Sequence, residues 1–270
     1  MSKLLVKAKP GSGLVAKVTP ESAGWGYVGF ELRRLKPGDT VSGETGEQEA
    51  CLVFVTGRGK ARAGGVDFGG LGGRMSPFEG KPWSLYVPQG TNWTVTAETD
   101  LELGVCLAPG LSGGLPARAI GPDDVKQEVR GKGTNIRYVT NILPEGDPAD
   151  SLLVVEVITP GGHTSSYPPH KHDQDNLPAE SYLEETYYHR LNPPQGFAFQ
   201  RVYTDADEKG ERALDEVMAV EDGDIVMVPK GYHPCAACHG YDLYYLNVMA
   251  GPKRTWKFHN APEHEWLMKA

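Results

Sequence analysis

The sequence lacks several features that would assign it to large classes of protein. It has no basic cluster, and its 27 Lys and Arg against 35 Asp and Glu give a formal net charge of −8. A protein that binds a phosphate backbone needs concentrated positive charge, so nucleic acid is excluded as a partner. No apolar run is long enough to cross a membrane, and residues 1–9 carry no signal-peptide pattern. We therefore expect a soluble, cytoplasmic protein with no membrane partner.

Cysteine is scarce, and helical pattern is nearly missing. The 4 cysteines, Cys51, Cys106, Cys235 and Cys238, are too few for a disulfide framework in 270 residues and suit a reducing compartment. The 34 Gly and 21 Pro would interrupt the helices of a bundle. Because 39% of the residues are hydrophobic, the chain can still fill a core, which excludes wholesale disorder.

Short strand patterns recur along the whole chain and end at Gly, Pro or Asp turns. We expect strands at 52–55, 83–87, 93–97, 101–107, 152–158, 197–203, 225–228 and 244–249, and one short helix at 122–129. Strands of this length and spacing are typical of an antiparallel sandwich or barrel rather than of βαβ units. The sequence therefore predicts an all-β fold.

The two halves of the sequence are similar to each other. Leu-Lys-Pro-Gly-Asp at 35–39 corresponds to Ile-Thr-Pro-Gly-Gly at 158–162, and Val-Pro-Gln-Gly at 87–90 corresponds to Val-Pro-Lys-Gly at 228–231. Both pairs occur in the same order, which indicates a duplicated β domain.

Histidine is confined to the second half, where His163 is the first of 8. We predict an N-terminal domain over 1–128 that lacks metal ligands, and a C-terminal domain over 129–270 that carries the active site. The charged, Gly-containing segment at 121–134 is the expected linker.

Four side chains of the second half form a candidate metal-ligand set. His170 and His172 are two residues apart, so on an extended strand their imidazoles point to the same face. Glu185 can add a carboxylate from a neighbouring strand, and His233 follows a turn. Three imidazoles and one carboxylate suit a divalent transition metal (Zn, Mn, Fe, Co or Ni) and leave positions open for substrate.

These segments resemble the cupin superfamily. Residues 223–233 match its second motif, Gly-x5-Pro-x-Gly followed by a His, except that one residue fewer separates the Gly from the His. Residues 170–172 match the His-x-His of its first motif. Glu185 stands farther from this His-x-His than the cupin pattern has it, so Glu180 and Glu184 stay open as alternative ligands.

A longer resemblance is to the 5-deoxy-glucuronate isomerases of inositol catabolism, which are related to the uronate ketol-isomerases. Their pattern is found at 165–173, 183–190, 231–234 and 244–252. The resemblance implies a bicupin, with two tandem cupin (double-stranded β-helix, or jelly-roll) domains, of which the C-terminal one binds metal. It also implies a small-molecule sugar-acid substrate, 5-deoxy-D-glucuronate, and the product 5-dehydro-2-deoxy-D-gluconate; a homo-oligomer is left open.

An aldose–ketose isomerase must move a proton between C2 and C1 and stabilise an enediolate. A divalent metal can do this as a Lewis acid, and no nucleotide-binding glycine motif argues for an organic cofactor. The proton carrier should lie near the metal strands, where Glu180, Glu184, Tyr188 and His189 are candidates.

The substrate's own carboxylate calls for a cation. Arg190 and Arg201 are candidates because a guanidinium binds a carboxylate bidentately.

Two other functions share the same ligand set, namely an Fe(II) cupin dioxygenase and a non-catalytic sugar-binding cupin. A third motif, Cys-x-x-Cys-His at 235–239, matches the attachment sequence of c-type haem. Haem attachment takes place outside the reducing cytoplasm, so an incidental cysteine pair is the favoured interpretation.

Overall fold

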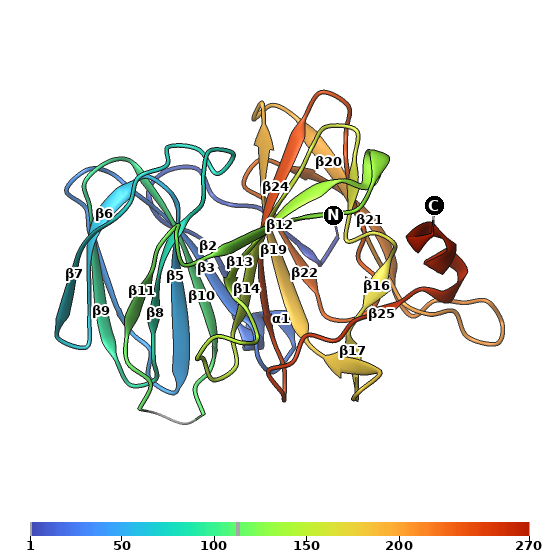
Figure 1. The fold of residues 1–270 in the computed structure, drawn as a ribbon, viewed down its shortest axis with the longest axis horizontal. Coiled ribbons are helices and arrows are strands. Elements are labelled where there is room, and N and C mark those ends of the chain that lie inside the picture. Colours follow the sequence, from blue (N-terminus) through green and yellow to red (C-terminus); the bar gives the residue numbers. More distant parts are fainter. Residues whose placement is uncertain (1, 112–113, 270) are drawn as a thin grey trace.

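The computed structural model describes residues 2–111 and 114–269 and places most of them in antiparallel β-sheets. Two β-sandwich units lie side by side, with their larger sheets facing each other at the centre (Figure 1). The protein is therefore layered as four sheets, with a smaller sheet on the outside of each unit.

The first unit contains a six-stranded and a four-stranded sheet, and the short helix α1 (Pro20–Ala23) precedes β3. In spatial order the larger sheet is β11 (Arg118–Ile120), β8 (Trp83–Val87), β5 (Gln48–Thr56), β10 (Leu101–Pro109), β3 (Gly29–Leu35) and β2 (Gly13–Val18). The smaller sheet is β4 (Thr40–Glu44), β9 (Asn92–Ala97), β6 (Arg58–Ala63) and β7 (Val66–Gly72).

The second unit contains a seven-stranded and a four-stranded sheet. The larger sheet is β1 (Leu5–Val6), β22 (Ile225–Val228), β19 (Glu184–Asn192), β24 (Asp242–Ala250), β14 (Leu153–Thr159), β13 (Arg137–Leu143) and β12 (Lys126–Arg130). The smaller sheet is β15 (Thr164–Ser165), β23 (Cys235–Ala237), β20 (Phe197–Tyr203) and β21 (Asp215–Glu221). Two hairpin-like pairs complete the unit: β16 (His170–Lys171) with β25 (His259–Asn260), and β17 (Asp173–Asn176) with β18 (Glu180–Tyr182). The short 3-10 helices are η1 (Gly133–Asn135) and η2 (Pro262–Met268).

The strands predicted from the sequence are confirmed, but the helix predicted at 122–129 is wrong. Residues 126–130 form β12, an edge strand that pairs with β13. Its sequence, Lys-Gln-Glu-Val-Arg, contains good helix formers, and pairing with an existing sheet overrides that weak local preference.

The two units have the same sheet order, which confirms the duplication. The strands β8, β5, β10, β3 and β2 occupy the places that β22, β19, β24, β14 and β13 take in the second unit. The smaller sheets correspond in the same way. The predicted boundary between residues 128 and 129 falls within β12, and the two domain ranges stay a prediction.

One strand crosses between the units. β1 pairs with β22 at the edge of the second unit's sheet, with Leu5 opposite Val226 and Val6 opposite Ile225. The beginning of the chain therefore pairs with the second unit rather than with the first.

Side chains alternate between two environments along the central strands. On β19, Tyr187 and Leu191 belong to the core inside the second barrel, whereas Tyr188 belongs to the core between the two units. On β5, Leu52 and Phe54 fill the first barrel, while Val53 packs against the second unit. A period of two thus separates barrel-facing from interface-facing residues.

Two buried carboxylates at equivalent positions connect the units reciprocally. Glu184, on β19, accepts hydrogen bonds from the backbone N–H groups of residues 26–28 at 2.7, 2.7 and 3.1 Å. Glu49, on β5, accepts from the backbone N–H groups of residues 150–152 at 2.7, 2.6 and 2.6 Å, and from the Tyr86 hydroxyl at 2.6 Å. Each unit therefore holds the segment that leads into β3 or β14 of the other.

Candidate metal centre

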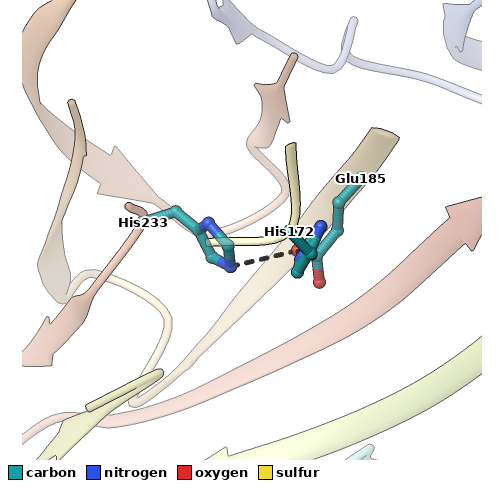
Figure 2. Close-up of side chains that lie close together, drawn as sticks. All are labelled: His172, Glu185 and His233. Carbon is teal, nitrogen blue, oxygen red and sulfur yellow. Dashed lines mark hydrogen bonds and ion pairs between the residues drawn. The ribbon is translucent and has the colours of Figure 1, made fainter. Parts of the chain in front are cut away.

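Three of the predicted ligands converge inside the second barrel. His172 lies between β16 and β17, Glu185 is on β19, and His233 lies in the loop between β22 and β23 (Figure 2). Their candidate ligand atoms all lie within 4.8 Å of one another, and all three residues are buried. Among the described residues, these three form the group of His, Cys, Asp or Glu side chains that is compact enough to hold a metal ion.

Local backbone features set these positions. The turn before His233 requires glycine at Gly231, where φ is +88° and an added Cβ would lie 2.3 Å from the Tyr203 carbonyl oxygen. Glu185 faces the barrel because it is in phase with Tyr187 on β19. Two local features therefore bring these distant segments together. The alternation of side chains along β19 turns Glu185 into the barrel, and the glycine turn positions His233.

The geometry of the imidazoles fits a cation. Nδ1 of His172 lies 3.0 Å from the Leu183 carbonyl oxygen, and Nδ1 of His233 lies 2.9 Å from that of Gly231. A carbonyl can only accept, so each Nδ1 donates and each neutral ring keeps a lone pair on Nε2. A second hydrogen bond of this kind is typical of histidines that ligate metals.

Those lone pairs face a carboxylate oxygen. Nε2 of His172 lies 3.1 Å, and Nε2 of His233 lies 3.2 Å, from the same Oε2 of Glu185. The His233 Nε2 is buried without a hydrogen-bond partner. Acceptors in this arrangement repel unless a proton or a metal ion lies among them, so the donor set fits a divalent transition metal.

The electrostatics of the two rings differ. Burial alone would lower the pKa of His172, but the hydrogen bond and charge of Glu185 outweigh it and raise that pKa. For His233, burial dominates and lowers the pKa to about 3. The His233 ring is therefore neutral at physiological pH and can offer Nε2 to a metal ion, whereas a proton would compete with such an ion at His172.

His170, the fourth predicted ligand, lies beside this group rather than in it. Its ring centroid is 5.0 Å from that of His233 and 6.4 Å from that of His172, and the ring contacts Phe258 at 4.7 Å. His170 lines the cavity that leads to Glu185. The structure therefore brings three of the four predicted ligands together and places the fourth at the wall of the same cavity.

This cavity has a volume of about 40 Å³. Besides His170 and Glu185, its walls include Tyr187, Tyr245 and Asn247. The Asn247 side-chain amide donates to Oε1 of Glu185, which orients the carboxylate. The sequence contained Tyr187 and Tyr245 within tyrosine pairs, and only the strand phase tells which member of each pair faces the barrel.

A buried ion network supports the ligand loops. Nζ of Lys171 lies 2.7 Å from Asp173 and 3.1 Å from Glu180, and the other oxygen of Asp173 accepts from the Gly231 N–H at 2.9 Å. The network thereby ties the segment with His172 to the turn before His233. Glu180, predicted as a proton carrier or alternative ligand, is engaged in this network.

The strand phase corrects three candidates on β19. Glu184, Tyr188 and Arg190 alternate with Glu185 and therefore face the first unit, away from the cavity. The Tyr188 hydroxyl donates to Glu102 at 2.6 Å. Arg190 pairs with Glu102 and with Asp222. These side chains connect the units and face away from the group formed by His172, Glu185 and His233.

Two further candidates do not line the cavity, although the His189 ring lies 5.9 Å from that of Tyr187 and 6.0 Å from that of Tyr245, which do. His189 is buried with its Nε2 2.9 Å from the Gln200 side-chain oxygen, and burial lowers its pKa to about 4. Arg201 is 41% exposed and pairs with Asp215 at 2.7 Å. Proximity in sequence to the metal strands therefore did not place either side chain at the site.

The Cys-x-x-Cys-His segment does not form one site. Cys235 is buried on β23, and burial raises the pKa of its thiol, whereas His239 is exposed.

Among the residues that the structure describes, no helix is long and apolar enough to cross a membrane.

A larger cavity of about 270 Å³ lies in the first unit. Its charged side chains already neutralise one another, since Glu31 pairs with Lys17 at 3.0 Å and with Arg33 at 2.7 Å. The register explains why the described residues of this unit contain no equivalent group of candidate metal ligands. Ala50 pairs with Val87 as Glu185 pairs with Val228, so an alanine stands where the second unit has its carboxylate.

Comparison with known proteins finds one family and relatives that match almost the whole chain. The profile of the KduI/IolB family matches residues 4–267. A 5-deoxy-glucuronate isomerase of Geobacillus kaustophilus is 56% identical over 273 residues, which cover 100% of this chain and 97% of that protein.

Solved structures agree on the fold. The crystal structure of an IolB-like protein from Salmonella typhimurium has a TM-score of 0.94 and 54% identity and covers 98% of this chain and 99% of its own. Oxalate decarboxylase of Lactobacillus farciminis has a TM-score of 0.67 at 13% identity, with 100% of this chain and 91% of that chain covered. The predicted bicupin fold is therefore confirmed.

Proposed function

This chain belongs to the KduI/IolB family and is an isomerase, and we propose that it converts 5-deoxy-D-glucuronate to 5-dehydro-2-deoxy-D-gluconate in myo-inositol catabolism. The proposal rests on its full-length similarity to relatives with that name, together with a ligand group inside the second barrel. The free thiols of Cys51, Cys106, Cys235 and Cys238 suit a cytoplasmic site for this reaction.

The reaction is an internal redox exchange that needs no external oxidant. The substrate's aldehyde carbon gains a hydrogen and becomes an alcohol, while the neighbouring hydroxyl-bearing carbon loses one and becomes a ketone. A divalent transition metal held by His172, Glu185 and His233, with His170 as the proposed fourth ligand, would supply Lewis-acid stabilisation of the enediolate. The balance requires no organic cofactor.

The chain's own groups have separate roles. Asn247 holds Glu185 in position through its side-chain amide. The Tyr187 hydroxyl lies at the cavity, 2.9 Å from the Ser166 hydroxyl, and burial raises its pKa well above the usual range. Tyr187 therefore stays protonated and can donate a hydrogen bond to a developing oxyanion.

We also propose a division of labour between the two ranges. Residues 129–270 carry the site, and residues 1–128 support it through the contacts between units. Asn92 follows Gly90 at the same spacing as His233 follows Gly231, so the first range lacks this imidazole as well as the carboxylate.

The test is metal analysis combined with an isomerase assay on 5-deoxy-D-glucuronate. We expect His172→Ala to lose both bound metal and turnover, and His239→Ala, which changes an exposed histidine outside the cluster, to keep both. Full turnover and full metal content in His172→Ala would contradict the site. Turnover under strict exclusion of oxygen separates the isomerase from an Fe(II) dioxygenase with the same ligands.

A further inference from the structure

Two arginines on paired strands line the cavity that contains Glu185. Arg130, the last residue of β12, is the register partner of Arg137, the first residue of β13, and both line the cavity with His170 and Glu185. Like charges directly opposite each other on paired strands are destabilising. Their placement at the same cavity therefore indicates an anion that binds between or beside them.

The two guanidinium groups differ in how they are neutralised. Arg130 bonds Glu128 through Nε at 3.0 Å and lies over the Trp256 ring at 5.4 Å. Arg137 donates to the Asn135 carbonyl at 3.1 Å, and within the described ranges no carboxylate lies within ion-pair distance of it. Arg137 thus retains donors for a ligand, in contrast to Arg190 and Arg201, which have carboxylate partners.

The turn between the two strands is shaped around Arg137. At Gly131, φ is +85°, and an added Cβ would lie 1.9 Å from the Asn135 carbonyl oxygen and 2.8 Å from an Arg137 guanidinium nitrogen. Only glycine allows the guanidinium and the carbonyl that accepts from it to approach the backbone this closely. The position of Arg137 is therefore fixed by the fold.

The arginines share one cavity with two of the proposed ligands, because Arg130 and Arg137 line it together with His170 and Glu185. Glu185 is the carboxylate among the residues that line the cavity, and it faces the histidines. The part of the cavity lined by Arg130 and Arg137 is therefore cationic.

We propose that Arg137, with Arg130 beside it, binds the carboxylate of the sugar-acid substrate while the aldehyde end points to the metal cluster. This assignment rests on the proposed function, and it replaces Arg190 and Arg201 in that role. A planar guanidinium binds a carboxylate through two parallel hydrogen bonds, which fixes the direction of an extended sugar acid. Arg137 is thereby a specificity-determining residue that distinguishes acids from neutral sugars.

The experiment compares Arg137→Leu and Arg137→Lys with Arg201→Leu, which removes an exposed arginine outside the cavity. Calorimetry measures binding of 5-deoxy-D-glucuronate and of its uncharged analogue with an alcohol in place of the carboxylate, and metal analysis accompanies each variant. The parent should bind the acid more tightly than the analogue. Arg137→Leu should weaken acid binding by about 10- to 100-fold, as expected for losing charged hydrogen bonds, with metal content and analogue binding unchanged. Arg137→Lys keeps the charge, so its affinity for the acid should lie between those of the parent and of Arg137→Leu. It tests the subsite if the leucine variant does not fold.

Equal binding of acid and analogue by the parent, or an Arg137→Leu variant that matches Arg201→Leu, would overturn the subsite. The same data distinguish this failure from failure of the proposed function. A parent that prefers the acid through Arg137 but never isomerises it keeps the subsite and refutes the isomerase reaction. A parent that isomerises the acid while Arg137→Leu retains its KM refutes the subsite alone.

Discussion

Glu184 offers a sharp separation between a structural and a catalytic carboxylate. It is 1% exposed and accepts from three backbone N–H groups of the first unit. In Glu184→Gln, one side-chain oxygen remains and an NH₂ group faces the same donors. Because a hydrogen bond to a charged group is worth about 1.5–3 kcal/mol, we expect the free energy of unfolding to fall by about 2–4 kcal/mol.

The measurement pairs urea unfolding with steady-state kinetics on the folded protein. Loss of a general acid or base costs about 10²- to 10⁴-fold in rate, whereas a side chain that faces the other unit should leave kcat within a few fold. Glu49→Gln is the matched control, since Glu49 of the first unit accepts the equivalent bonds from residues 150–152 at 2.6–2.7 Å and lies outside the barrel that contains Glu185. The two variants should lose similar stability.

A selective result would refute this reasoning. If Glu184→Gln unfolds like the parent but loses activity by two orders of magnitude or more, while Glu49→Gln does not, then Glu184 acts in the reaction and the strand-phase argument fails.

Three other expectations follow from the site. His233→Ala should lose metal affinity by at least tenfold, measured by competition with a chelator, and an unchanged affinity would remove it from the ligand set. Lys171→Met should lower the free energy of unfolding by about 3–5 kcal/mol, because it leaves the carboxylates of Asp173 and Glu180 without their cation. It should also weaken metal binding. An unaltered free energy of unfolding would contradict the stabilising role of this network. His189 has a pKa of about 4 against an unperturbed 6.5, so the unfolded chain takes up a proton first as pH falls. Stability should therefore decline between pH 6.5 and 4 by up to about 3 kcal/mol from this group, and His189→Gln should flatten that part of the denaturation profile.

The sequence predicted the class of fold and the strands with strong apolar runs. The segments 83–87, 197–203 and 225–228 coincide with β8, β20 and β22. Strands such as β6 and β12 were missed because their residues are polar or include glycine. Such strands form only through pairing with neighbours that the chain supplies from elsewhere.

The metal group could be inferred in advance, but the direction of its neighbours could not. His172 and His233 are marked by short motifs that report local backbone geometry. By contrast, the adjacent residues Tyr187 and Tyr188 are of the same type, so the sequence does not tell which of them faces the barrel. The register of β19 shows that they lie on opposite faces of the strand. Arg137 lay outside every motif, because its role depends on a register partner and on a cavity built from distant strands.

The pairing of β1 with β22 has a consequence for the order in which the protein assembles during synthesis. Leu5 and Val6 leave the ribosome long before Val226 and Ile225, their partners, have been made. The first barrel can close early from its own strands, but β1 must wait with an open edge until most of the chain has emerged. The pairing of β1 with β22 therefore closes a loop that spans most of the chain, and it does so beside the turn that carries His233.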